Sequence, residues 1–167
     1  MPALDAFRVL GVAADFVPFA PAARESVYPF YPYKPNLESV ARLLEAGTVL
    51  VLPDVSGLHT TDSEFVKIFL ERGGAVLAFG PQLPMGNTYD RDRILGATEG
   101  PRVPRREIVV RNAKGGRARA GARFALPAVR SWAGWKAASA SVVAEFEDGT
   151  AAVFTNRVGE GLIASFA

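Results

Sequence analysis

The chain contains a single histidine, His59, in a segment that is also rich in aspartate, serine and threonine. Asp54, Ser56 and Asp62 lie near it, and these are the residue types of a nucleophile, a base and an orienting carboxylate. The segment follows an apolar run expected to be a strand, and open α/β sheets bind ligands beyond the carboxyl ends of their strands. Asp, Ser and Thr serve turns and helix caps equally well. We therefore treat Asp54, Ser56 and His59 as a candidate ligand loop, with catalysis there as the minor alternative.

Other patterns of catalytic or metal-binding residues are not supported. The chain has no cysteine, which excludes disulfides, thiolate metal sites and cysteine nucleophiles. Residues 80–86 contain too many prolines for a phosphate-binding loop, because proline has no amide to donate to the anion. Asp90 and Asp92 are two residues apart on an expected helix, so their side chains point in different directions. We expect neither a metal nor a cofactor.

Two groups of aromatic residues are candidates for binding a sugar or a partner chain. Tyr31 and Tyr33 belong to a proline-rich stretch, residues 19–35, which is expected to be an ordered but irregular loop. Trp132 and Trp135 have basic neighbours and can stack on a sugar or a base. Tryptophans at this spacing more often fill the seam between a sheet and an appended β unit, and we favour that interpretation.

Composition and charge indicate a folded protein without naming a partner. Of the 167 residues, 49% are hydrophobic and 22% are charged, as in ordinary globular domains. No apolar run is long enough to span a membrane, and the N-terminus lacks the order of a signal peptide, so a cytoplasmic location is expected. Residues 102–130 contain nine Lys or Arg and a single acid. A solvated strand face is the commoner explanation for such a stretch, and nucleic acid is not an expected partner.

The first hundred residues alternate between helical and strand patterns, which predicts a parallel α/β sheet. Thr48–Leu52 is almost wholly apolar, as expected of a strand covered on both faces by helices. Thr61 to Glu64 fit a capping box, so the helix after this strand is expected to begin at Asp62. The other expected elements are helices at Pro2–Leu10, Asn36–Ala46 and Asp90–Leu95, and strands at Val12–Phe16 and Ala75–Phe79.

After Pro104 the pattern changes to that of short antiparallel strands. They are expected at Glu107–Arg111, Arg117–Phe124, Ser141–Glu147, Thr150–Thr155 and Leu162–Phe166. Asp148-Gly149 is a hairpin signal, because both central positions of the expected turn favour a positive φ. The predicted organisation is an α/β domain over residues 1–100 and an antiparallel β unit over 101–167 packed on it.

Several of these segments resemble the class I glutamine amidotransferase-like fold, and more narrowly the trimerisation domain of family 42 β-galactosidases. The similar stretches are Val49–Pro53, Thr61, Phe69–Ala78, Ile94–Gly96, Phe146–Gly149, Ala152–Val153 and Thr155–Ile163. The resemblance implies a three-layer, flavodoxin-like parallel sheet. It also implies a non-catalytic structural domain whose relatives belong to glycoside hydrolases and act in carbohydrate metabolism. No barrel domain is encoded in the chain.

Two departures from that family carry expectations of their own. In glutamine-hydrolysing relatives the loop after Phe79 holds a cysteine, whereas here it reads Gly80-Pro81-Gln82, a degenerate nucleophile loop. The family's first strand, central in a flavodoxin-like order, is lacking, and an open sheet edge invites pairing. We expect self-association as a homo-oligomer, a trimer if the resemblance holds, and contact with a glycoside hydrolase barrel. The alternative is a protein that binds a small ligand or sugar through the strand-end loops or through Trp132 and Trp135.

Overall fold

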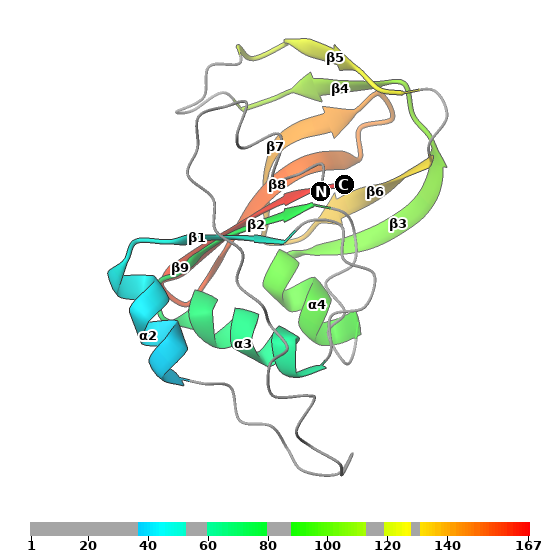
Figure 1. Cartoon of the computed structure of the whole chain (residues 1–167). Coiled ribbons are helices and arrows are strands. Elements are labelled where there is room, and N and C mark those ends of the chain that lie inside the picture. The colour runs from blue at the N-terminus through cyan, green and yellow to red at the C-terminus, as the bar shows by residue number, and fades with distance from the viewer. Residues whose placement is uncertain (1–36, 53–59, 80–87, 113–118, 128–130) are drawn as a thin grey trace. The chain divides into compact units, whose positions relative to one another are not determined.

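The computed structural model describes residues 37–52, 60–79, 88–112, 119–127 and 131–167 (Figure 1). These residues fall within one compact unit, Pro35–Ala167. The helix expected at Pro2–Leu10 and the strand expected at Val12–Phe16 lie outside the described residues. None of the helices in the described part of the chain is both long and apolar enough to cross a membrane.

Within these ranges, helices and strands alternate at first and strands follow one another later (Figure 1). The helices are α2 (Leu37–Glu45), α3 (Thr60–Glu71) and α4 (Thr88–Leu95). The strands are β1 (Val49–Leu52), β2 (Ala75–Phe79), β3 (Ala97–Pro104), β4 (Glu107–Val110), β5 (Arg123–Ala125), β6 (Ser131–Ala137), β7 (Ser141–Phe146), β8 (Ala151–Val158) and β9 (Gly161–Phe166).

All of these strands belong to one mixed sheet. β1, β2 and β9 are parallel neighbours, and the sheet continues through antiparallel β8, β7, β4 and β5. β6 branches from β8 through Trp135 and Ala151, and β3 pairs with β6. The predicted α/β fold with a parallel core and antiparallel strands is confirmed. The sheet runs across the boundary expected near residue 100, because the last strand, β9, lies inside the parallel part beside β2.

A close approach of main chains positions β9 against the end of α3. α3 ends at Glu71 and the chain then turns at Gly73, whose φ of 94° lies in the left-handed region that glycine favours; the amide of Gly74 donates to the carbonyl of Phe69. The Leu162 amide then donates to the Gly74 carbonyl at 3.1 Å. A Cβ atom on Gly161 would clash with the carbonyl oxygens of Leu70 and Gly74. Glycine at this position therefore lets the strand begin directly under the helix.

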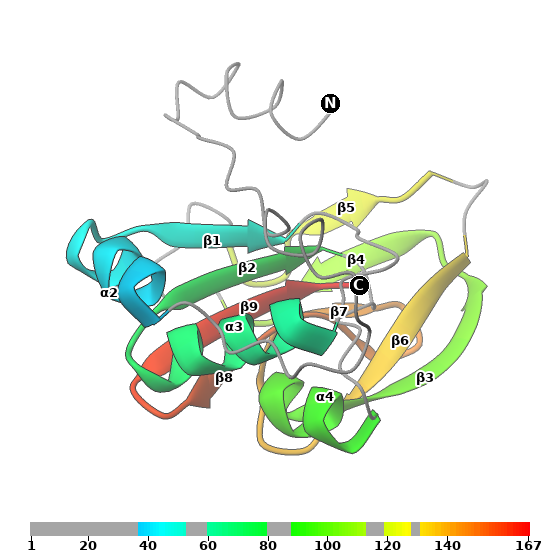
Figure 2. The ribbon, with the colours of Figure 1, turned by 60° about the horizontal axis from the view of Figure 1, so that its bottom comes forward.

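Helices cover one face of the parallel strands in the described structure. α3 packs on β2 and β9, α4 packs on β8 and β9, and α2 packs against α3. The side chains beneath them are buried and mostly apolar: Leu50, Leu52, Val76, Ala78, Phe154, Ile163 and Ser165. Figure 2 shows no described helix on the opposite face. Of the three layers expected from the sequence, the described residues form two, the sheet and the helices on one of its faces.

Several expected boundaries are wrong, each for a local reason. α3 begins at Thr60, two residues before the expected start at Asp62. Within the described residues, which resume at Arg119, the strand expected over Arg117–Phe124 begins only at Arg123, because Gly121 adopts a φ of 83° in a turn. β3 and β6 were missed, since glycine and proline interrupt their alternation. At the 148–149 turn only Gly149 has a positive φ, so the turn is not one with two left-handed residues.

Candidate functional site

Most of the site residues predicted from the sequence lie outside the described part of the chain. They are Tyr31, Tyr33, Asp54, Ser56, His59, Gly80, Pro81 and Gln82. The structure does describe the strands that precede two of these loops, β1 and β2, and it places them side by side. It also describes the remaining pair of candidates, Trp132 and Trp135 on β6.

The carboxyl ends of β1, β2 and β9 lie at one edge of the sheet because the three strands are parallel. Phe79 and Phe166, at the ends of β2 and β9, are register partners there, and their rings stack with centroids 5.0 Å apart and planes 22° apart. The strand-end residues Leu52, Phe79 and Phe166 are all apolar. The strand ends at this edge are therefore hydrophobic, and none of these three residues has a titratable side chain.

The most distinctive surface is the side of β1, β2 and β9 that faces away from α3 and α4. We call it the open face. It is formed by Val49, Val51, Ala75, Leu77, Phe79, Leu162, Ala164 and Phe166, which alternate with the buried residues along each strand. Val49 is 54% exposed, Leu162 43% and Phe79 38%. The open face combines an exposed apolar surface with the absence of any charged residue among its eight members.

The open face was missed in the sequence, although its signal was present. Val49 to Leu52 are apolar on both sides of the strand, and so are Ala75 to Phe79. That pattern was interpreted as burial under helices on both faces. In the described structure α3 and α4 lie on one side of these strands, and Val49, Phe79 and Leu162 on the other side are exposed (Figure 2).

Trp135 lies in the interior and not on a sugar-binding surface. It is 1% exposed, its ring lies 5.6 Å from that of Phe154 on β8, and the guanidinium carbon of Arg91 lies 5.5 Å from the ring centroid. Arg91 is held there by Glu99 at 2.8 Å. This packing corresponds to the seam interpretation of the tryptophans. Trp132 is half-buried, and the indole nitrogens of both tryptophans are buried without a hydrogen-bond partner in the described structure.

Arg105 is a buried cation whose contacts are internal. Its side chain is 2% exposed, and Nε and Nη2 donate to Oδ2 of Asp148 at 3.1 and 2.8 Å. Nη1 donates to the carbonyl of Trp132, and the guanidinium lies 4.6 Å from the ring centroid of Phe146. Since each guanidinium nitrogen already has an acceptor, Arg105 joins β3, β6 and the 147–149 turn and does not face a ligand.

Hydrogen bonds lower the pKa of the two acids of the 147–149 turn, Glu147 and Asp148. Burial raises the pKa of Asp148, but the hydroxyl and amide of Thr150 and the Arg105 guanidinium together bring that pKa below its ordinary value. The amide of Arg106, donating at 2.8 Å, leads the causes that lower the pKa of Glu147. A general acid at neutral pH needs the opposite shift, so neither carboxyl is suited to that role.

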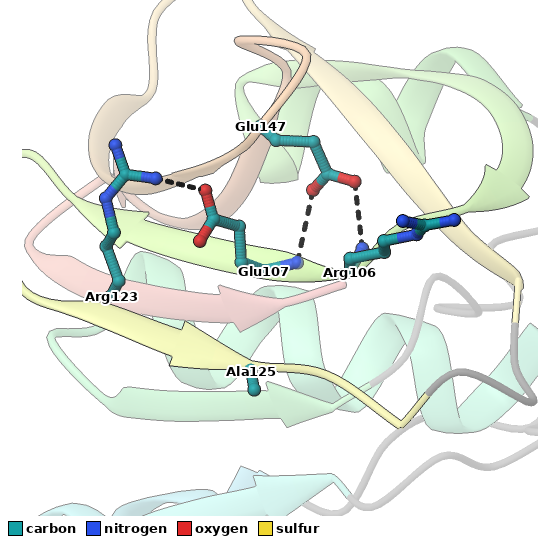
Figure 3. A pocket seen from close by; sticks show the side chains of 5 residues that line it. All are labelled: Arg106, Glu107, Arg123, Ala125 and Glu147. Atoms are coloured by element: carbon teal, nitrogen blue, oxygen red, sulfur yellow. Dashed lines mark hydrogen bonds and ion pairs between the residues drawn. The ribbon is translucent and has the colours of Figure 1, made fainter.

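An open hollow of about 510 Å³ lies beside this turn, lined by Arg106, Glu107, Arg123, Ala125 and Glu147 (Figure 3). Figure 3 shows the Glu147 carboxylate above the main chain of Arg106 and Glu107, whose amides donate to its two oxygens, and Arg123 paired with Glu107. The two glutamates and Arg123 therefore interact within the hollow itself. This arrangement braces β4 against β5 and β7 and does not select a charged ligand.

Much of the basic stretch seen in the sequence is neutralised in the same way. Within the described residues, Arg102 pairs with Glu99 at 3.6 Å and Arg111 with Glu145 at 2.6 Å, in addition to the pairs of Arg105 and Arg123. Most of these acids come from other parts of the chain, so the local excess of positive charge is smaller in space than in sequence. No group of three or more His, Cys, Asp or Glu suited to a metal ion occurs in the part that the structure describes.

No family model and no curated protein sequence matches the chain. Solved structures do. A β-galactosidase from Bacillus circulans sp. alkalophilus matches over 71% of this chain and 20% of its own, with a TM-score of 0.58 and 18% identity. The chain has the class I glutamine amidotransferase-like fold. The resemblance to the trimerisation domain of family 42 β-galactosidases is confirmed at the level of fold, and the matched region spans only about a fifth of the enzyme.

Two further matches with this fold cover larger shares of the other proteins. A cytoplasmic protein from Salmonella typhimurium matches over 98% of this chain and 72% of its own, with a TM-score of 0.63 and 16% identity. A putative ThuA-like protein from Bacteroides uniformis matches over 71% of this chain and 58% of its own, with a TM-score of 0.54 and 12% identity. At these identities the likeness shows a shared fold and carries no activity to this chain.

Proposed function

We propose that the chain is a non-catalytic structural domain that mediates self-association, comparable to the trimerisation domain of family 42 β-galactosidases. We further propose that it is part of, or derived from, a carbohydrate-active protein and contacts a glycoside hydrolase barrel. The observation that carries the proposal is the structural match to a segment that makes up 20% of a β-galactosidase. The chemistry of the described residues agrees with it, because Arg105 binds Asp148 and the Glu147 carboxylate accepts from the amides of Arg106 and Glu107, so all three side chains are engaged within the fold.

The test of this proposal is the oligomeric state of the full chain. Sedimentation velocity over a range of concentrations is expected to show species heavier than the 17.8 kDa monomer. A chain that sediments as a monomer at every concentration would contradict the proposal. Addition of a family 42 barrel that lacks its own accessory domain tests the second part, and we expect co-sedimentation.

The second candidate is a protein that binds a small ligand or sugar, as weighed from the sequence. The match that favours it covers 98% of this chain, and the matched protein is described as a cytoplasmic protein and not as a β-galactosidase. A thermal-shift screen with sugars distinguishes the two candidates. A shift removed by His59→Ala would support the strand-end loop, and one removed by Trp132→Ala would support β6. Trp135→Ala is unsuitable as a probe because removing a fully buried indole lowers stability whatever the function.

A further inference from the structure

The hollow beside the 147–149 turn contains two successive main-chain donors that point in one direction. The amides of Arg106 and Glu107 both donate to the Glu147 carboxylate, at 2.8 Å to Oε1 and 3.2 Å to Oε2 (Figure 3). Successive amides that point the same way form a concavity suited to an anion. Here the anion is a side chain of the protein itself. Glu147 therefore occupies a site that has one donor for each oxygen of a planar carboxylate.

The side chains around these amides suit an anionic ligand once Glu147 has left. The Arg106 guanidinium lines the hollow, is exposed and has no acceptor in the described structure. Arg123 is held by its ion pair with Oε1 of Glu107. With Glu147 in place, the two arginines and two glutamates that line the hollow have no net charge, and without it they have a charge of +1. Glu147 therefore neutralises a site that is otherwise cationic.

Glu147 can leave the hollow without breaking the turn that carries it. Its side chain is exposed. The turn itself is closed by main-chain bonds: the Phe146 amide donates to the Thr150 carbonyl at 2.9 Å, and the Gly149 amide donates to the Phe146 carbonyl at 3.0 Å. The next residue, Asp148, is held separately by the Thr150 hydroxyl at 2.6 Å. Since none of these bonds uses the Glu147 side chain, rotation of that side chain alone uncovers both amides.

The size and lining of the hollow define the class of ligand. Its volume of about 510 Å³ is in the range of sites for small organic molecules and exceeds what a carboxylate alone fills. Four of its five lining residues are charged and the fifth is Ala125, so the body of the ligand is polar. We propose that the hollow binds a small hydroxylated carboxylate, the chemistry of a sugar acid, which replaces Glu147 on the amides of Arg106 and Glu107 and has the Arg106 guanidinium as its countercharge. This site does not depend on the proposed self-association.

Calorimetric titration of the full chain with glucuronate tests the proposal, with glucose as the uncharged counterpart. The tethered Glu147 carboxylate competes with the ligand at an effective concentration of about 1 mM or more, so the unmodified chain should bind glucuronate weakly. Glu147→Ala removes the competitor and should bind it at least about tenfold more tightly. Glu145→Ala is the matched control, because it also removes one negative charge and frees an arginine, Arg111, but leaves both amides occupied. Its affinity should equal that of the unmodified chain.

NMR spectra of isotopically labelled protein locate the bound ligand. In Glu147→Ala, glucuronate should shift the backbone amide resonances of Arg106 and Glu107, and adding Arg106→Met to that variant should weaken binding. Circular dichroism checks folding, and if Glu147→Ala is unfolded, Glu147→Gln takes its place with a smaller gain, because glutamine keeps an acceptor but not the charge. Three results would each overturn the proposal: an affinity no higher than that of Glu145→Ala, equal binding of glucose, or tighter binding of inorganic phosphate at the same amides.

Discussion

Replacement of Arg105 by methionine tests whether the buried cation is a structural brace. The substitution keeps much of the apolar stem and removes the guanidinium, whose Nη2 lies 2.8 Å from Oδ2 of Asp148. It also leaves the carbonyl of Trp132 without that donor. Asp148 keeps its hydrogen bonds from the amide and hydroxyl of Thr150, at 3.0 and 2.6 Å, and so is not left isolated.

The expected loss of stability depends on which polar groups the substitution leaves buried without a partner. Breaking a buried ion pair from one side costs about 3–5 kcal/mol. Asp148 is 41% exposed, so water replaces part of what it loses, and we expect a loss of about 3 kcal/mol in the free energy of unfolding. For a chain of this length that corresponds to a fall in Tm of roughly 6–12 °C. Asp148→Asn leaves the buried Arg105 cation without its countercharge and should also cost about 3 kcal/mol.

Urea denaturation and thermal melts of Arg105→Met, Asp148→Asn and the variant with both substitutions measure the coupling between the two side chains. The matched control is Arg102→Met, because Arg102 is 48% exposed and only 3.6 Å from Glu99. An exposed pair of this kind contributes at most about 1 kcal/mol. If Arg105→Met unfolds at the same urea concentration as the control, the bracing role is wrong. If it instead weakens ligand binding or association at unchanged stability, Arg105 belongs to a site.

The other predictions concern pH, a buried amide and a close main-chain approach. Because the fold lowers the pKa of Asp148, ionised Asp148 stabilises the protein at pH values above its ordinary pKa of about 3.9, and this stabilisation is lost as the pH falls further. In Asp148→Asn, the urea concentration at the midpoint of unfolding should therefore depend less on pH between about pH 5 and pH 2 than in the unmodified chain. Asn156 donates to the carbonyls of Arg93 and Ile94 at the end of α4, at 3.3 and 2.9 Å, and Asn156→Asp should lower the unfolding free energy by about 2–4 kcal/mol in urea titrations. Gly161→Ala forces a methyl group against main-chain carbonyls and should cost about 1–3 kcal/mol by thermal melting.

Local sequence was sufficient to predict the elements of the parallel core. β2 has the predicted bounds, and α2, β1 and α4 lie within two residues of theirs. These segments combine a strong hydrophobic period with clear ends, such as Gly47 after α2. The pairing of β9 with β2 was not predictable in this way, because strand order depends on contacts between residues more than eighty positions apart. Nothing in the Gly161–Phe166 stretch distinguishes an inner strand from the last strand of a meander.

The candidate site shows the same division between local and long-range information. The apolar composition of Val49–Leu52 predicts a strand, but composition alone does not show whether helices cover one or both faces of that strand. The partners of the basic stretch were also hidden, since Arg105 and Asp148 are 43 residues apart in the chain. Four of the six arginines that the structure describes in residues 102–130 pair with carboxylates. Such long-range pairings become visible only once the strands are placed.

The distribution of charge distinguishes the hollow from the open face of β1, β2 and β9. Arg91, Arg105, Arg111 and Arg123 each pair with a carboxylate, and these pairs join strands or brace turns. Each pairing uses donors and acceptors that a polar ligand would need. The open face has the opposite character, because its exposed residues have no polar side chain to satisfy and gain only by excluding water. Self-association through this face would be selected by shape and not by charge. Moderate salt should leave such self-association unchanged, whereas an association that weakens as salt rises would place the contact on the arginine-rich strands instead.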